Sequence, residues 1–156
     1  MAALAVFMLL HLVFPAVSPA AGTAAVSVSA TILSKSVCRF NSKGFVLNFG
    51  NVDPGSVTDA TATATVGFRC GGSAGTAVFA IVADAGLHGT GGFPRMQSGT
   101  IPSEFLPYFL ALNPTTGNVP KNTNQTLTAT GTIRRSDFQN ASAGTYTDTV
   151  VLTILP

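Results

Sequence analysis

The C-terminal residues 144–156 alternate regularly between apolar and small polar side chains. Val150, Leu152 and Ile154 point to one face of the segment, while Thr147, Thr149 and Thr153 point to the other. A period of two over this length is typical of a β-strand with one buried face. The pattern therefore predicts a C-terminal strand whose three aliphatic residues are turned inward.

A second alternating segment, residues 24–33, lies near the N-terminus. Its apolar face is formed by Val26, Val28, Ala30 and Ile32. Small polar residues form the opposite face, so this segment is also predicted to be a strand. Two interpretations remain open, because the segment either pairs within its own domain as a first strand or pairs with another molecule.

Further strands are predicted between these two ends, and no helical period competes with them. They cover residues 45–49, 60–70, 76–83, 105–112 and 126–133. Residues 86–99 are rich in glycine and residues 113–124 are polar, so both are predicted to be loops or turns. Pro107 places its segment at a sheet edge or at the start of a strand. Short strands at this spacing, separated by Gly, Asn and Pro, predict an all-β sandwich.

The first 20 residues have the pattern of a signal peptide. Ala2 to Val17 is almost unbroken apolar sequence, and Ser18 and Ala20 fit the small-x-small pattern that precedes a cleavage site. The run is too short to be a convincing membrane span. We therefore predict export and three parts: a signal peptide (1–20), an N-terminal extension (21–33) and one domain (34–156).

Charge is sparse in this sequence. Only 9% of residues are charged, and the formal net charge is +2. The basic residues are scattered, with Arg134 and Arg135 as the only adjacent pair, so there is no basic stripe for nucleic acid and no polybasic membrane anchor. A domain this poor in charge has little repulsion to keep neighbours apart, which favours a protein that assembles.

The chain has two cysteines, Cys38 and Cys70. In an exported protein an even pair predicts a disulfide, and the alternation of residues 60–70 places Cys70 on the core face. In the chain-entropy description, closing this loop is worth roughly 3–4 kcal/mol. The alternative, two free thiols or half of a metal site, would need further ligands that the sequence lacks.

Catalytic residues are scarce. His88, in the glycine-rich stretch, is the one histidine beyond the predicted signal peptide, and no GxSxG motif accompanies it. A lone loop histidine is usually a solvated side chain, and the sequence HGTGGF offers no metal ligands beside it. The six acidic residues form no local pair of the kind glycosidases use. We predict that the protein is not an enzyme and has no cofactor.

Several motifs in order along the chain resemble one known family. They are SVSATILSKSVC (27–38), VLNFGNVDPGS (46–56), ATVGFRC (64–70), RMQSG (95–99), LPYFLAL (106–112) and AGTYTDTVVLTIL (143–155). Together they resemble the spore coat protein U domain family, which includes the archaic, Csu-type chaperone–usher pilus subunits. The resemblance covers essentially the whole chain after the predicted signal peptide.

The resemblance implies an immunoglobulin-like sandwich that lacks its last strand and is completed by a donated one. It also implies three kinds of partner: a periplasmic PapD-like chaperone, an outer-membrane usher and neighbouring pilus subunits. On this hypothesis Val26, Val28, Ala30 and Ile32 are the donor residues, and Val150, Leu152 and Ile154 line part of the acceptor groove. The expected role is a surface pilus that serves adhesion or biofilm formation.

Two other functions stay open at this point. One is a secreted spore-coat or extracellular-matrix protein that works without an usher. The other is a small secreted hydrolase, which would require a functional role for His88.

Overall fold

The computed structural model of the chain describes residues 25–31 and 36–156. The chain divides into two units, Met1–Thr31 and Ile32–Pro156, and each is described by itself. The second unit contains these elements: β1 (Ser36–Phe40), β2 (Ala60–Gly72), β3 (Thr76–Ala83), β4 (Arg95–Ser98), β5 (Phe105–Pro107), β6 (Phe109–Asn113), β7 (Thr116–Pro120), β8 (Asn124–Ile133), α1 (Arg135–Phe138), β9 (Tyr146–Thr147) and β10 (Leu152–Leu155). Among the described residues the four-residue α1 is the one helix, and it is too short to cross a membrane.

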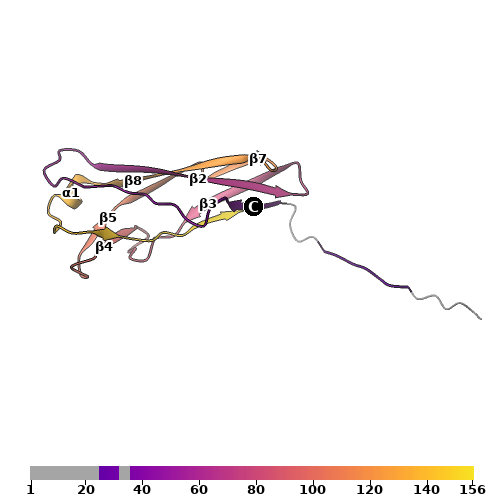
Figure 1. Cartoon of the computed structure of the whole chain (residues 1–156), viewed down its shortest axis with the longest axis horizontal. Helices are drawn as coiled ribbons and strands as arrows, with labels where there is room; N and C mark the ends of the chain where they lie inside the picture. Colours follow the sequence, from indigo (N-terminus) through magenta and orange to yellow (C-terminus); the bar gives the residue numbers. More distant parts are fainter. Residues whose placement is uncertain (1–24, 32–35) are drawn as a thin grey trace, which may run out of the picture. The chain divides into compact units, whose positions relative to one another are not determined.

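The strands form three antiparallel sheets. Their orders are β1-β2-β8-β6, β10-β3-β7 and β5-β4-β9. The long strands β2 and β8 pair over ten residues and run side by side along the domain (Figure 1). The structure therefore confirms the predicted all-β sandwich.

Alternation along β2 and β8 builds the main core. Residues 62, 66, 68 and 70 of β2 are buried while the intervening threonines are exposed, as the period of two predicts. Phe68 is fully buried, and its ring lies 4.8 Å from that of Phe79 in β3, centroid to centroid. The contact between Phe68 and Phe79 thus packs the β1-β2-β8-β6 sheet against the β10-β3-β7 sheet.

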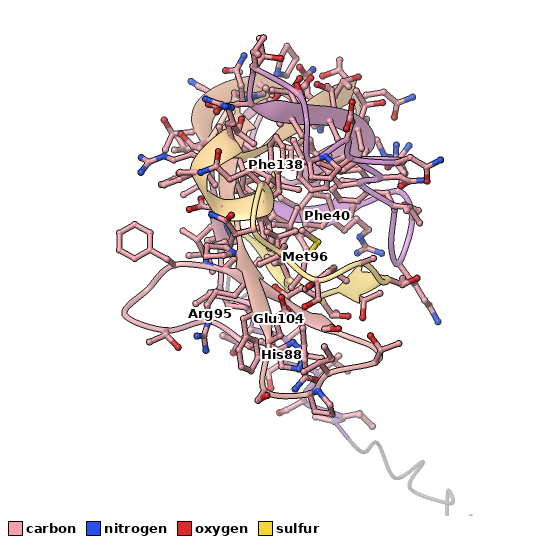
Figure 2. All side chains as sticks on the ribbon, turned by 90° about the vertical axis from the view of Figure 1, so that its left-hand side faces the viewer. Phe40, His88, Arg95, Met96, Glu104 and Phe138 are labelled. Atoms are coloured by element: carbon pink, nitrogen blue, oxygen red, sulfur yellow. A yellow bond between two sulfur atoms is a disulfide. The ribbon has the colours of Figure 1, made fainter. Side chains whose placement is uncertain are left out.

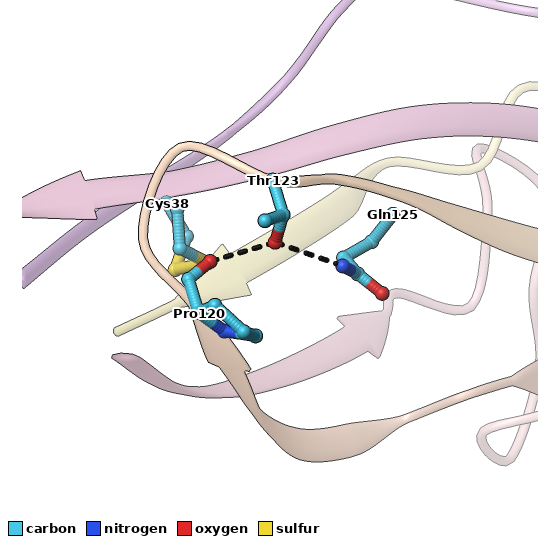
Figure 3. Close-up of a disulfide and its surroundings, with 5 residues drawn as sticks. Cys38, Pro120, Thr123 and Gln125 are labelled. Carbon is cyan, nitrogen blue, oxygen red and sulfur yellow. Dashed lines mark hydrogen bonds between the residues drawn. A yellow bond between two sulfur atoms is a disulfide. The ribbon is translucent and has the colours of Figure 1, made fainter. Parts of the chain in front are cut away.

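The disulfide closes one end of this core. Cys38 in β1 and Cys70 in β2 are register partners and form the predicted bond. The turn between β7 and β8 lies beside it (Figure 3), where the Thr123 hydroxyl donates to the Pro120 carbonyl and accepts from the Gln125 amide. This end of the sandwich is therefore fixed by a covalent bond and by a hydrogen-bonded turn.

Three predicted segments differ from the structure. Residues 105–112 do not form one strand, because Tyr108 separates β5 from β6 and the chain passes from one sheet to another. The short strands β4 and β7 lie inside the two stretches that were predicted to be loops. Neither has the apolar alternation that marks a strand. Strand β7 pairs with the distant strand β3, and β4 pairs with the nearby β5 and with the distant β9. Pro107 lies in the edge strand β5, as predicted.

Residues 45–49 have the predicted alternation but form no strand. The ladder with β2 ends where the Asn41 N–H donates to the Gly67 carbonyl, 2.8 Å away. Beyond it, residues 42–52 form no backbone hydrogen bond to any strand in the described part of the chain. The predicted strand is therefore absent. Of the three alternating residues, Leu47 and Phe49 are partly buried and Phe45 is exposed.

Candidate functional site: an open groove beside the C-terminal strand

An apolar groove runs between residues 45–52 and the C-terminal segment 145–152. One part has a volume of about 530 Å³, and a second part has a volume of about 590 Å³. Both parts are lined by Leu47, Asn48, Phe49, Met96, Thr145 and Tyr146, so they join into one groove. The groove follows the length of the C-terminal segment, which suits an extended chain.

The C-terminal segment forms one wall of the groove and is paired on one side only. Strands β9 and β10 both lie at the edge of their sheets. Between them, the N–H groups of Leu87 and Asp84 donate to the carbonyls of Thr149 and Val151, each 3.1 Å away. The opposite side of residues 146–155 has no backbone partner in the described part of the chain. A row of free N–H and C=O groups therefore borders the groove.

The predicted inward face of this segment is present, and it continues further toward the N-terminus. Residues 146, 148, 150, 152 and 154 are all partly buried, and the residues between them are exposed. Val150 and Leu152 line the groove. Ile154 packs against the main core instead and is not a lining residue.

The opposite wall of the groove is formed by residues 45–52, which pack against a glycine of β8. A Cβ atom at Gly131 in β8 would lie 2.6 Å from both Leu47 Cδ2 and Phe49 Cζ. The missing side chain therefore lets these two residues sit directly on the sheet. The alternation of residues 45–49 predicted a strand and did not indicate a groove wall.

The floor comes from β6 and β8. Leu110, Leu112 and Ala129 line it, with Met96 and Tyr108 beside them. The sequence pattern did not indicate these residues as part of the groove, because they come from strands that only the fold brings beneath the edge strand. The apolar character of residues 105–112 was a signal for Tyr108, Leu110 and Leu112.

One charged residue, Asp148, is among the residues that line the first part of the groove. Its side chain is 2% exposed, and its Oδ2 accepts a 2.9 Å hydrogen bond from the Tyr108 hydroxyl. Burial, followed by this hydrogen bond, raises the pKa of Tyr108 above its ordinary range. The carboxylate thus fixes the edge strand to the segment between β5 and β6.

His88 completes this cluster and is not the solvated loop residue that the sequence suggested. Its Nδ1 lies 3.4 Å from Asp148 Oδ1, and its side chain is 26% exposed. The Arg95 Nε–H donates to the His88 carbonyl at 2.8 Å, so the two residues lie together at one end of the domain (Figure 2). The loop that contains His88 packs against the edge strand and so links His88, Asp148 and Arg95.

A second polar contact holds the other part of the groove wall. The Ser142 N–H donates to Glu104 Oε1 at 2.7 Å, and this bond lowers the pKa of the Glu104 carboxyl. Desolvation, then the neighbouring Glu104, raises the pKa of Tyr146, whose hydroxyl donates to the Ser142 carbonyl. These hydrogen bonds hold Ser142 in place, just before the C-terminal segment begins.

The predicted donor residues lie in the first unit, apart from Ile32. Val26 and Val28 are 85% and 89% exposed, and Ala30 is also exposed. Ile32 and the predicted signal peptide lie outside the described residues. Within residues 25–31 and 36–156, no group of three or more His, Cys, Asp or Glu side chains could hold a metal ion.

Comparison with known proteins identifies the family. The fold is an immunoglobulin-like sandwich with an open edge. The chain belongs to the Spore Coat Protein U domain family, whose sequence model matches residues 22–153. This family consists of structural proteins without catalytic activity, in agreement with the prediction that the chain is not an enzyme. No curated protein sequence matches the chain significantly.

Two solved structures are similar to this chain. One is the CsuC–CsuE chaperone–tip adhesion subunit pre-assembly complex from archaic chaperone–usher Csu pili of Acinetobacter baumannii, with 21% identity and a TM-score of 0.50 over 76% of this chain and 39% of that one. The other is a chaperone–tip adhesin complex of CFA/I fimbriae, with 13% identity and a TM-score of 0.47 over 78% of this chain and 41% of that one. The chain therefore spans less than half the length of either matched chain.

Proposed function

We propose that the chain is a secreted structural subunit of a chaperone–usher pilus that polymerises by donor-strand complementation. The observation that carries the proposal is the apolar groove beside the unpaired side of residues 146–155. A strand laid in this groove would pair with the free backbone groups and bury the floor. Such β-augmentation takes its affinity from main-chain hydrogen bonds and its specificity from alternate side chains.

The donor in this proposal is the N-terminal extension of a neighbouring copy or a related subunit. Val26, Val28 and Ala30 alternate with polar residues and are exposed, so their apolar side chains are available to another molecule. Residues 25–31 alone would span roughly 23 Å as a strand. Ile32 would add one further apolar side chain.

Two more partners follow from the family and the fold. A periplasmic chaperone would fill the groove before assembly, since an open edge of this kind invites aggregation. The similar Csu structure is itself a complex of a chaperone with a pilus subunit. An outer-membrane usher would exchange the chaperone for the next subunit, and the finished fibre would stand on the cell surface and serve adhesion or biofilm formation.

The proposal is tested by a charge placed on the donor face. Val28→Asp would put a carboxylate into an apolar groove, and the desolvation of that charge should abolish polymer formation. Ser27→Asp is the matched control, because the same charge lies on the opposite face and should leave assembly almost unchanged. Polymer length is read by electron microscopy and by native electrophoresis of the full chain expressed with the candidate chaperone.

Two further measurements separate assembly from folding. Deletion of residues 21–33 should block polymers while the chain still co-purifies with its chaperone. A stable monomer that needs no chaperone and is unchanged by the deletion would instead favour the coat or matrix protein without an usher. Fibres formed by the Val28→Asp protein would show that Val28 does not enter a groove.

A further inference from the structure

Two arginines lie directly opposite each other on the exposed face of the β1–β2 pair. Arg39 in β1 is the register partner of Arg69 in β2, and both are exposed. Side chains that face each other across antiparallel strands start from Cβ atoms roughly 4.5–5.5 Å apart. The two guanidinium groups can therefore reach the same small area of the surface.

Neither arginine has a partner that explains its position. No side-chain hydrogen bond or ion pair joins Arg39 or Arg69 to any other described residue, and all six acidic residues of the chain lie in the described part. Like charges in directly opposite positions destabilise a sheet. The pair is thus unfavourable for the isolated domain, and an anion bound between the arginines would remove that repulsion.

Arg69 lies between two glycines on its own strand, and an asparagine side chain lies over each glycine. Its neighbours on the same face of β2 are Gly67 and Gly71, which have no side chains. A Cβ atom at Gly67 would lie 2.6 Å from the Asn41 amide nitrogen, and one at Gly71 would lie 3.2 Å from the Asn122 amide oxygen. The two asparagine side chains therefore lie over the glycines and flank Arg69 with amide groups that can donate and accept hydrogen bonds.

The same face continues as an uncharged array of hydroxyl groups. Three threonine pairs match across β2 and β8, Thr61 with Thr132, Thr63 with Thr130 and Thr65 with Thr128, and Thr126 lies opposite Gly67. Neighbouring strands are about 4.8 Å apart, and residues of one face repeat about every 6.7 Å along a strand. The result is a regular surface of hydroxyls that starts beside the arginines.

We propose that this face, the paired-arginine surface, binds an acidic polysaccharide. The guanidinium groups of Arg39 and Arg69 would hold a sugar carboxylate through paired N–H···O bonds. Asn41, Asn122 and the threonine hydroxyls would bond the hydroxyl groups of the adjoining sugars. The surface lies on the β1-β2-β8-β6 sheet, and the proposal is independent of what fills the groove.

Other polyanions fit this surface less well. Nucleic acid binding uses tracks of basic residues and, for single strands, stacking aromatic rings, whereas two arginines and hydroxyls form this surface. Anionic membranes are recognised by clusters of about four to eight basic residues. A single pair of guanidinium groups is enough to hold one sugar carboxylate.

The test measures binding of the purified full chain to immobilised polygalacturonate, with neutral dextran as the reference polymer. Arg39→Gln and Arg69→Gln should each weaken binding about tenfold, because each removes a charge-assisted hydrogen-bonding group. Arg134→Gln is the matched control. It removes the same charge at the other end of the sheet, where Arg134 covers the Phe109 ring, and it should change binding less than about twofold.

Folding and specificity are followed in the same experiment. The Gln variants should keep or raise the thermal midpoint, because each relieves the like-charge pair, so loss of binding cannot be ascribed to unfolding. Arg69→Lys should bind more weakly than the native chain although it keeps the charge. Equal binding by the native and Gln proteins, equal retention on dextran, or tighter binding to DNA or to anionic vesicles would overturn the proposal.

Discussion

The sandwich has a disulfide end, around Cys38 and Cys70, and a groove end, around residues 45–52 and 145–152. Both ends have apolar side chains, but these are buried more completely at the disulfide end. The core cluster at the disulfide end has nine buried residues and four that are partly buried. The cluster at the groove end has four buried residues and eight that are partly buried. The core at the disulfide end is therefore mostly buried. At the groove end the apolar side chains are present, but part of their surface stays exposed.

The cause is pairing, because both ends have apolar side chains. At the disulfide end every strand has neighbours, and the covalent bond joins β1 to β2. At the groove end the chain leaves the ladder after Asn41, and residues 45–52 lie across the sheet without backbone partners. An apolar surface with one missing strand is a binding site, whereas the same residues beneath a complete sheet would be an ordinary core.

The largest effect is expected from truncation of one aromatic ring at each end. Phe68→Ala should lower the free energy of unfolding by about 3–5 kcal/mol, because the fully buried ring leaves a cavity. Phe49→Ala, at the partly buried groove wall, should lower it by less than about 2 kcal/mol in the free chain. Urea titration checks both values, and equal losses would mean that the groove end is as well packed as the other.

Loss of the disulfide should come next. The Cys38→Ala/Cys70→Ala double variant should be about 3 kcal/mol less stable than the oxidised native protein, since the unfolded chain regains the entropy of an open loop. The native protein in reducing buffer should show a similar loss in the same titration. Polymerisation by the folded fraction should persist, because the bond lies at the end away from the groove floor.

A smaller and more local effect is expected at Gly131. Gly131→Val would displace Leu47 and Phe49 from the sheet and cost about 1–3 kcal/mol by overpacking. The same variant should lose donor binding out of proportion to its stability. Ala77→Gly, in the main core and outside the groove lining, is the control, and peptide binding of residues 24–33 to the chaperone-free subunit is the measurement.

The smallest effect concerns pH. The pKa of Tyr108 in the folded chain is raised above its ordinary value of 10.0 by burial and by Asp148. The proton is therefore held more tightly in the folded state, and the stability that it contributes is complete below pH 10 and falls as pH rises above that value. Tyr108→Phe should remove this alkaline loss from a pH series of thermal midpoints. An identical slope in both proteins would contradict the assignment.

Much of the fold could be read from local pattern. The strand at residues 76–83 has the predicted bounds, and β2 and β8 differ from prediction by only a few residues at their ends. The segments of β2 and β8 alternate over eight residues or more, which identifies their buried faces, and residues 76–83 are marked as a strand by a short apolar run. Strands β4 and β7 have four and five residues without such alternation, and pairing with distant strands decides their existence.

The candidate site could be predicted only in part. Val150 and Leu152 were found because they belong to a patterned strand. The histidine at position 88 was misjudged because its partner Asp148 lies 60 residues further along the chain, and no local spacing records that contact. The opposed arginines were likewise not recognised, since Arg39 and Arg69 become neighbours only through the register of β1 and β2.

The sequence by itself determined which faces of the long strands are apolar, where some of the turns fall and that two cysteines are available for a bond. Those properties are local, because side-chain alternation and turn chemistry act within a few residues. The tertiary structure decided which edges remain unpaired, where the groove lies and which charges face one another. Those properties depend on strand pairing between distant segments, and a shift of one residue in register would turn every side chain to the other face.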